Sequence, residues 1–295
     1  MRVLLLIATN FAVLLLASVT LNLLGVGPWL TQHGVQYGPL LVIGAVIGFG
    51  GAFFSLAISK WQAKHLMGVE VITAPRNDTE TWLVATVRHH AEAAGIGMPE
   101  VGIFDSPEPN AFATGASRNH ALVAVSTGLL ARMSRVQAEA VMGHEVTHVA
   151  NGDMVTLTLI QGVVNTFVFV LSRVIGELVD RMLFRRDDER GGTGIGVFVT
   201  TIIAQVILSF LASMIVMWFS RRREFRADAG GARLAGRGAM IGALEALKRV
   251  QSEGLPAGMQ AFGIKGPDRL SGLKKLLMSH PPLDERIAAL QQPAA

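Results

Sequence analysis

Apolar residues are concentrated in four long runs, which alternate with segments of ordinary polar content. In chain order the runs cover about residues 3–26, 38–59, 154–172 and 194–219. A helix needs roughly 20 apolar residues to cross the hydrocarbon core of a bilayer, so each run is long enough to span a membrane. We therefore predict a transmembrane hairpin in residues 1–60 and two further apolar helices in residues 154–220.

The first run could also be read as a cleaved signal peptide. The apolar core of such a peptide covers roughly 7 to 15 residues, which is shorter than this run. The pattern therefore favours an uncleaved membrane anchor.

The charges beside the runs predict their orientation. The linker between the first two runs holds no Lys or Arg, whereas Lys60 and Lys64 follow the second run. By the positive-inside rule, both ends of the hairpin and the polar segment after it lie in the cytoplasm. The linker between the last two runs, residues 181–192, holds four arginines, which contradicts the rule if both of these runs cross the bilayer.

Residues 61–153 have the pattern of a small α+β domain. A helix is predicted to begin at Asn77, to carry an apolar stripe on one face and to end near Gly95. Short β-prone stretches separated by turn residues follow, at residues 101–104, 111–115 and 121–126. They indicate a small sheet of strands linked by hairpins.

A second helix is predicted at the end of this segment. Ser134 and Gln137 have the spacing of a capping box, which would open the helix. Asn151 and Gly152 supply the left-handed stop signal that would end it.

Beyond the fourth run, residues 221–295 return to a soluble pattern. Helices are predicted at residues 239–251 and 270–278, with a loop rich in Gly and Pro between them and a short tail after Pro281 and Pro282. We expect residues 61–153 and 221–295 to form the two parts of one cytoplasmic domain.

Composition limits the chemistry. Apolar residues make up 51% of the chain and charged residues 16%, which does not fit a wholly soluble enzyme. The absence of cysteine excludes disulfides, thiol nucleophiles and thiolate metal sites, so any metal must use His and carboxylate ligands. Basic residues gather at the ends of apolar runs, for example at 221–223, which suits anionic lipid headgroups. No basic stripe interleaved with aromatic residues is present, and no nucleic-acid partner is expected.

The sequence HEVTH at residues 144–148 is the strongest candidate site. His144 and His148 are four residues apart, so a helix puts both imidazoles on one face, where they could share a zinc ion. Glu145 could accept a proton from an attacking water and pass it to the leaving amine. A solvated helix face would be the ordinary interpretation, but the neighbouring Val141 and Met142 are apolar and favour the metal site.

A catalytic zinc needs a third protein ligand. One large class supplies a histidine six residues after the second and a glycine three residues after it; here these places hold Met154 and Asn151, which rules that class out. The best remaining candidate is Glu224, just beyond the fourth run, with Asp228 on the same helical face to orient a ligand imidazole. A surface ladder of Glu, Arg and Asp ion pairs fits the same spacing equally well.

Three weaker candidates lie elsewhere. Residues 110–115, beginning with Asn110 and Ala111, could be an edge strand that pairs with an extended substrate, or an internal strand of the core. His280, ahead of two prolines, could donate a hydrogen bond to an oxyanion, with help from Arg286. Taken alone, the histidine fits an ordinary loop and the arginine an ordinary surface position.

Several motifs in the right order resemble the HtpX family of bacterial membrane zinc proteases, which are related to eukaryotic prenyl-protein proteases. They are HEVTH followed by NGD at 151–153, EFRAD at 224–228, NAFATG at 110–115 and SHPPL at 279–283. The resemblance covers nearly the whole chain. It implies an α+β zincin-like (gluzincin) catalytic domain combined with a mainly four-helix transmembrane region.

The same resemblance implies the roles of the site residues. His144, His148 and Glu224 would bind one zinc ion per chain, and Glu145 would be the catalytic base. The implied role is proteolytic quality control and stress response at the bacterial inner membrane, on protein substrates in or near the bilayer, with the active site facing the cytoplasm. No particular oligomeric state is predicted.

Two other classes of function compete with a protease. A membrane scaffold with a structural or inactive zinc site would have no use for the carboxylate of Glu145. A transporter should carry ionisable residues within its spans, whereas Arg173 and Glu177 lie at the edge of the third run. The endopeptidase is therefore the leading hypothesis.

Overall fold

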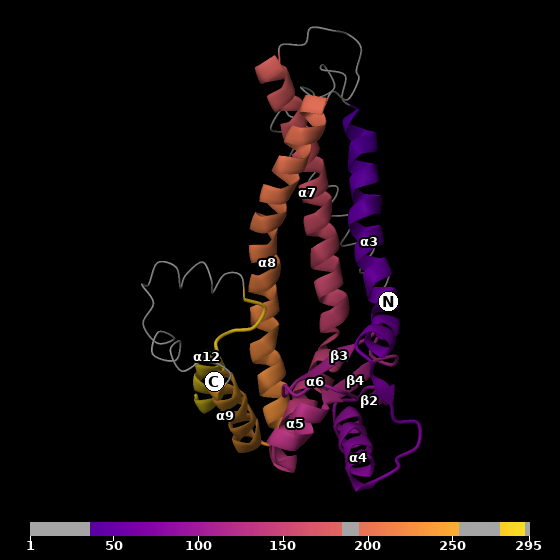
Figure 1. Ribbon diagram of the computed structural model, residues 1–295, viewed down its shortest axis with the longest axis vertical. Coiled ribbons are helices and arrows are strands. Elements are labelled where there is room, and N and C mark those ends of the chain that lie inside the picture. Colours follow the sequence, from indigo (N-terminus) through magenta and orange to yellow (C-terminus); the bar gives the residue numbers. More distant parts are fainter. Residues whose placement is uncertain (1–35, 185–194, 254–277, 293–295) are drawn as a thin grey trace. The chain divides into compact units, whose positions relative to one another are not determined.

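The computed structural model describes residues 36–184, 195–253 and 278–292, drawn as coloured ribbons in Figure 1. The predicted first run and most of the predicted helix 270–278 lie outside these residues. The chain divides into two compact units. We call them the helical unit, Met1–Ser55 with Leu157–Val216, and the mixed unit, Leu56–Thr156 with Met217–Ala295.

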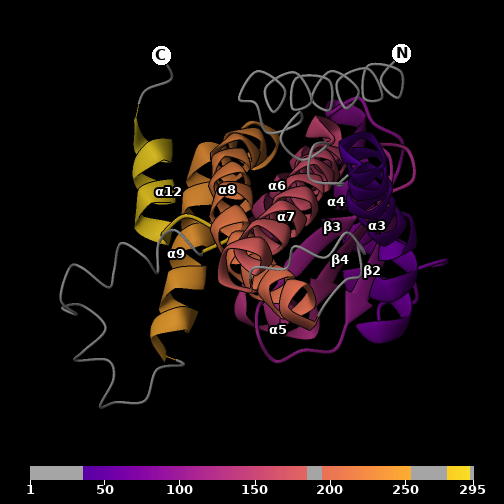
Figure 2. The same cartoon turned by 90° about the horizontal axis from the view of Figure 1, so that it is seen from above.

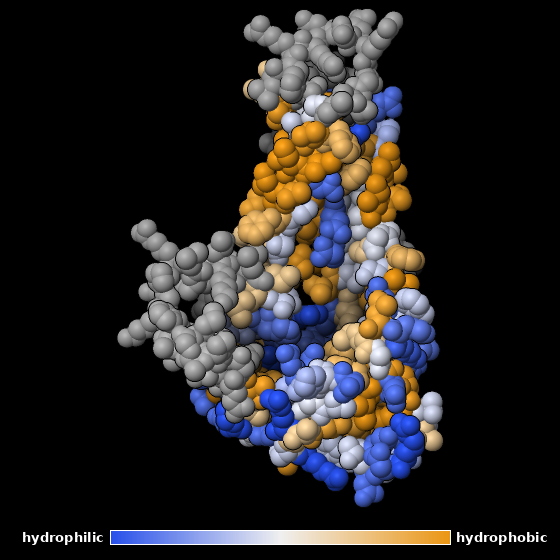
Figure 3. All heavy atoms as spheres, in the orientation of Figure 1, coloured by the Kyte–Doolittle hydropathy of each residue, from blue (hydrophilic) through white to orange (hydrophobic). Residues whose placement is uncertain are grey.

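Three long helices contain the second, third and fourth apolar runs: α3 (Tyr37–Leu66), α7 (Asp153–Phe184) and α8 (Ile195–Ala235). Each holds a stretch apolar and long enough to cross a bilayer. Side chains such as Val46 and Ile207 are more than half exposed, and apolar residues gather over α3 and α8 in Figure 3. Exposed apolar surface of this kind fits lipid as its surroundings.

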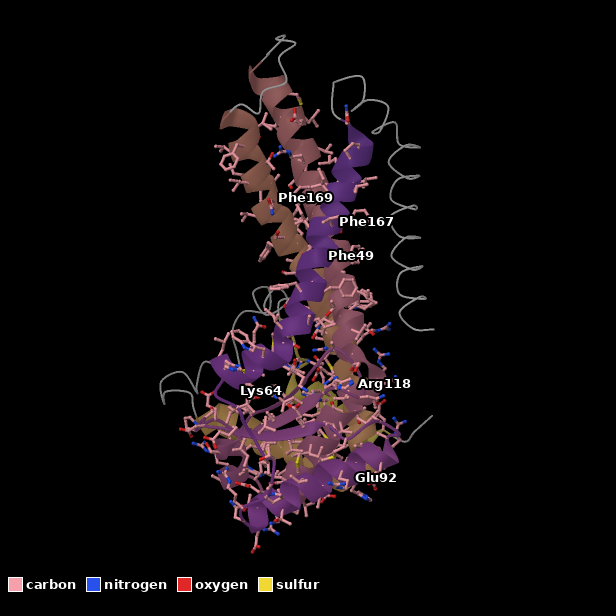
Figure 4. The ribbon with its side chains drawn as sticks, turned by 90° about the vertical axis from the view of Figure 1, so that its right-hand side faces the viewer. Phe49, Lys64, Glu92, Arg118, Phe167 and Phe169 are labelled. Carbon is pink, nitrogen blue, oxygen red and sulfur yellow. The ribbon has the colours of Figure 1, made fainter. Side chains whose placement is uncertain are left out.

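Within the helical unit, α3 and α7 approach closely through glycine. A Cβ atom added at Gly48 would lie 2.4 Å from Oγ1 of Thr166, and one at Gly162 would lie 2.4 Å from the ring of Phe49, which is labelled in Figure 4. Small residues allow such close packing of apolar helices. The helix α7 continues to Phe184, so the predicted linker at 181–192 begins too early.

The mixed unit is built on a four-stranded sheet with the order β1-β2-β4-β3. The strands are β1 (Glu70–Val71), β2 (Glu100–Phe104), β3 (Ala111–Thr114) and β4 (Leu122–Ser126). The prediction that hairpins link all the strands is wrong for β2 and β4, which pair in parallel. After β2 the chain first forms β3 at the edge of the sheet and then turns back to form β4 between β2 and β3. Among the described strands, only β3 and β4 therefore form a hairpin.

Local signals fix the helices around the sheet. The helix α4 (Asp78–Ala93) begins where Oδ1 of Asn77 accepts a hydrogen bond from the backbone of Glu80. The helix α6 (Arg135–Asn151) begins at the capping box of Ser134 and Gln137 and ends at Gly152, whose φ is 70°. These predictions are confirmed.

Two helices of the mixed unit were not predicted, the short α5 (Thr127–Arg132) and the C-terminal α12 (Leu283–Gln291). Beyond α9 (Arg237–Glu253), the structure has α12 where the sequence predicted a short tail. Figure 2 shows α12 beside α9, and an ion pair between Lys248 and Asp284 joins the two. The prediction was wrong because α12 is only nine residues long and relies on packing against α9.

The main hydrophobic core lies between the sheet and the helices of the mixed unit. It unites side chains from α4, β4, α6 and α9, including Leu83, Val123, Met142 and Leu244, each fully buried. The core therefore holds α6, which carries the HEVTH motif, against the sheet on one side and α9 on the other.

Candidate metal centre

The helix α6 brings the two histidines of the motif together. His144 and His148 are both buried, and their Nε2 atoms lie 3.1 Å apart. The spacing of four residues on a helix accounts for this, since one turn separates the side chains. The two nitrogens are close enough to share one ion.

Glycine lets α8 approach α6. A Cβ atom added at Gly230 would lie 2.2 Å from Cγ2 of Thr147, and one at Gly231 would lie 3.0 Å from the backbone nitrogen of His144. Because neither position has a side chain, the two helices can pack with their backbones close. This contact brings Glu224, earlier on α8, to the motif.

Glu224 completes a group of three possible ligands. Its carboxylate oxygens lie 3.5 Å from Nε2 of His144 and 3.3 Å from Nε2 of His148. Ligand atoms of all three residues lie within 4.8 Å of one another. Glu224 and Asp228 are 0% and 1% exposed, so the alternative of a surface ion-pair ladder is wrong.

The group fits a metal ion on two grounds. Oε1 of Glu224 is buried without a hydrogen-bond partner, which is costly unless a cation satisfies it. Two imidazoles and one carboxylate are also a ligand set of catalytic zinc sites, which keep a fourth position open. The structure thus brings together His144, His148 and Glu224 as the sequence predicted.

Each imidazole has a carboxylate at its other nitrogen. Nδ1 of His148 lies 2.7 Å from Oδ2 of Asp153, and Nδ1 of His144 lies 2.9 Å from Oδ1 of Asp228. The sequence interpretation named Asp228 but gave no role to Asp153. The sequence feature that could have indicated Asp153 is its place directly after Gly152, the glycine that ends α6, five residues after His148.

Loop 278–282 and α12 supply the remaining groups. Arg286 is 6% exposed and donates two hydrogen bonds to Asp228, from Nε at 2.7 Å and from Nη2 at 2.6 Å. The alternative of a surface arginine is therefore wrong. His280 is more exposed, and its Nδ1 lies 2.8 Å from Oε2 of Glu224.

The pKa values of the metal-free site follow from these contacts. Burial alone would lower the pKa of His148, but the neighbouring carboxylates of Asp153 and Glu224 outweigh it and raise the pKa to about 9. Burial likewise opposes the shift at His144, where the contacts with Asp228 and Glu224 raise the pKa. Burial would raise the pKa of Glu224, yet hydrogen bonds from the surrounding histidines hold it far below its usual range.

The site is open on one side. Glu145 is partly exposed and lines a cavity together with Asn110, Ala111, His280 and Arg286. The strand β3, which begins at Ala111, lies at the edge of the sheet, so the alternative of an internal strand is wrong. The candidate site residues named from the sequence therefore lie together in the mixed unit.

Comparisons with known proteins agree with this geometry. Residues 77–294 match the model of peptidase family M48. The chain belongs to family M48. Protease HtpX homolog of Thiobacillus denitrificans is 62% identical over 290 residues, and Protease HtpX of Nitrosococcus oceani is 60% identical over 292; each match covers 98% of both chains. The crystal structure of S. mikatae Ste24p has a similar fold, with a TM-score of 0.56 and 19% identity over 93% of this chain and 67% of that one.

Membership of family M48 makes this protein a metallopeptidase, and its apolar helices together with its bacterial HtpX relatives indicate a bacterial membrane protein. The resemblance to HtpX proteases and the prediction of a membrane metalloprotease are confirmed. An inactive scaffold is not favoured. As a peptidase of family M48, the protein acts on protein substrates.

Proposed function

We propose that this member of family M48 is a zinc endopeptidase whose ion is held by His144, His148 and Glu224, one ion per chain. The observation that carries the proposal is a buried set of three ligand atoms within 4.8 Å of one another, next to the partly exposed Glu145. A glutamate on a second helix as third ligand corresponds to the gluzincin type of site. When bound, zinc would polarise the scissile carbonyl and make an attacking water more acidic.

The chain's own residues would carry the proton transfer. Glu145 follows the first ligand on α6 and lines the cavity, so its carboxylate can accept a proton from water and donate it to the amine nitrogen that leaves. His280 reaches the same cavity and can donate a hydrogen bond to the developing oxyanion. Asp153 and Asp228 hold the ligand imidazoles in one orientation, and Arg286 holds Asp228.

The edge of the sheet would bind the substrate backbone. An extended peptide can add to an edge strand through main-chain hydrogen bonds, which are largely independent of side-chain identity. Asn110 and Ala111 stand at the start of β3 and line the same cavity as Glu145. Unfolded or unassembled segments of proteins in or near the membrane fit this mode of binding.

We also propose that four helices cross the bacterial inner membrane and that the mixed unit faces the cytoplasm. Arg222 lies over the ring of Trp218 at 4.9 Å, and Trp61 is 55% exposed close to Lys60 and Lys64. Aromatic side chains are typical of both membrane–water interfaces, and basic side chains of the cytoplasmic one. The substrates would accordingly be misfolded or damaged membrane proteins, degraded under stress.

The test is hydrolysis of an unfolded protein such as casein by the full chain purified in detergent. We expect activity that a chelator abolishes and that added zinc restores. Glu145→Gln should keep the zinc and lose at least about a thousandfold in kcat, the combined size of general-base and positioning effects. Full activity of Glu145→Gln, or a zinc content unchanged in Glu224→Ala, would contradict the proposed roles.

A further inference from the structure

A cavity of about 320 Å³ adjoins the metal centre. One face carries the groups proposed to transfer the proton, and a second face has no part in that step. The lining of the cavity includes His144, Glu145 and Glu224, so the cavity is continuous with the proposed active site. Asn110 and Ala111, at the start of the edge strand, line it as well. A substrate held over the ligands would therefore present a side chain to this space.

The second face is apolar. Five side chains from α5, α6 and α9 form it: Leu129, Val141, Met240, Leu244 and Leu247. The three from α9 recur at the spacing of one helix face. None of the five can donate or accept a strong hydrogen bond.

The charged residues of α9 do not reach the cavity. Glu245 is exposed, and Lys248 forms an ion pair with Asp284 on α12. Neither residue belongs to the lining. A charged substrate side chain entering here would lose its water without gaining a partner on this face.

The apolar face is held in place by core packing. Leu129, Met240 and Leu244 are each at most 2% exposed and belong to the main hydrophobic cluster. A packed core has little freedom to make room for water or for a hydrated group. The face is therefore preformed and selects for shape and polarity.

We propose that the cavity is a specificity subsite that takes a large apolar side chain, aliphatic or aromatic, from the residue next to the scissile bond. In an extended substrate, successive side chains point to opposite sides, so only one of the two residues at the scissile bond enters. The inference rests on the proposed peptidase centre and adds the substrate class to it.

The experiment uses the zinc-loaded full chain in detergent and a set of quenched fluorescent peptides. The peptides share one sequence and carry Ala, Leu, Phe, Asp or Lys at one of the two positions flanking the cleaved bond. At one of these positions we expect kcat/KM for Leu and Phe to exceed that for Asp and Lys at least about tenfold. Equal values for apolar and charged residues at both positions would overturn the inference.

A variant tests the apolar face of the cavity directly. Leu247 is half-buried, so Leu247→Trp should fill part of the cavity without opening the core. We expect the preference at the selective position to move from Phe towards Ala by about tenfold or more, while zinc content stays at one per chain. An unchanged ratio of kcat/KM for the Phe peptide to that for the Ala peptide would overturn the assignment of this apolar face.

The matched control is Leu130→Trp, because Leu130 is also half-buried but lies outside the lining. It should keep the original preference. Hydrolysis that depends on zinc and Glu145 but ignores the flanking residue would reject the subsite alone. Absence of any zinc-dependent hydrolysis would reject the proposed function, and the subsite with it.

Discussion

At the residue scale, each imidazole of the site has a different carboxylate at its Nδ1 atom, the nitrogen that does not face the proposed ion. Asp153 follows His148 on the same stretch of chain, whereas Asp228 reaches His144 from α8. A carboxylate at Nδ1 keeps the proton on that nitrogen and leaves the Nε2 lone pair free for a metal. The pair of aspartates thus fixes which nitrogens face the ion.

We expect Asp153→Asn to weaken zinc binding by about tenfold to a hundredfold. The amide has nearly the same shape but no negative charge, so it holds the imidazole less firmly in the required tautomer. Competition with a fluorescent chelator measures the affinity. The loss should appear in the zinc dissociation constant and should shrink at saturating zinc.

Asp78→Asn is a suitable control for that change, because Asp78 is exposed at the start of α4. It removes the same charge far along the chain from the ligands. An equal loss of zinc affinity in both variants would argue that net charge, and not the contact with His148, is responsible.

Zinc binding should depend on pH through His148. Zinc needs the neutral imidazole, and the pKa of about 9 means that this side chain is protonated at neutral pH in the metal-free protein. Raising the pH through that pKa removes the competing proton, so affinity should rise by at least about tenfold per pH unit between about pH 7 and 9, and more steeply where His144, whose pKa is also raised, loses its proton too. Chelator competition across this range, corrected for the chelator's own protons, tests it; a flat profile would contradict the assigned pKa.

At the scale of elements, locally encoded features were predictable, whereas two long-range contacts of the mixed unit were not. The ends of α6 follow from Ser134, Gln137 and Gly152, which act within one turn of chain, and the motif itself lies inside that helix. The contact of Arg286 with Asp228 spans 58 residues, and nothing in the spacing of either indicates it. The parallel pairing of β2 with β4 was missed for the same reason.

The approach of α8 to α6 depends on a position without a side chain. We expect Gly230→Ala to destabilise the folded chain by about 1–3 kcal/mol and to reduce zinc occupancy, because the new Cβ would meet Thr147. The Thr147 hydroxyl also donates to the carbonyl of Gly143, at 2.7 Å, which limits its freedom to turn away. Thermal unfolding in detergent and metal analysis measure the two effects.

Two further variants check this explanation. Gly238→Ala makes the same change in α9, where no atom lies within 4 Å of the added Cβ, and should be neutral or slightly stabilising. Combining Gly230→Ala with Thr147→Ala should recover part of the lost stability, because Cγ2 and Oγ1 of Thr147, the two nearest atoms, are removed and only its Cβ at 2.8 Å remains. Without such recovery, the clash is not the cause.

At the scale of the whole molecule, orientation in the membrane can be tested with one reactive side chain. The chain has no cysteine, so Glu92→Cys, at an exposed position of α4 labelled in Figure 4, introduces a single thiol. Because Lys60 and Lys64 follow the second apolar run, we expect this thiol on the cytoplasmic side. A membrane-impermeant maleimide should label it in inverted vesicles but not in intact cells.

A permeant maleimide should label both preparations and serves as the control. Labelling of intact cells by the impermeant reagent would reverse the proposed orientation. In that case the four arginines at 181–190, and not the two lysines, would have determined how the chain inserts.

The contact between Arg286 and Asp228 has a consequence for biosynthesis. A ribosome adds Arg286 after every other residue of the site, 58 residues later than Asp228. Until then, among the described residues, only His144 can compensate the charge of Asp228, so packing of α8 with that carboxylate buried is less favourable. We therefore expect nascent chains to stay inactive until the segment that carries Arg286 has been synthesised and has folded against α8.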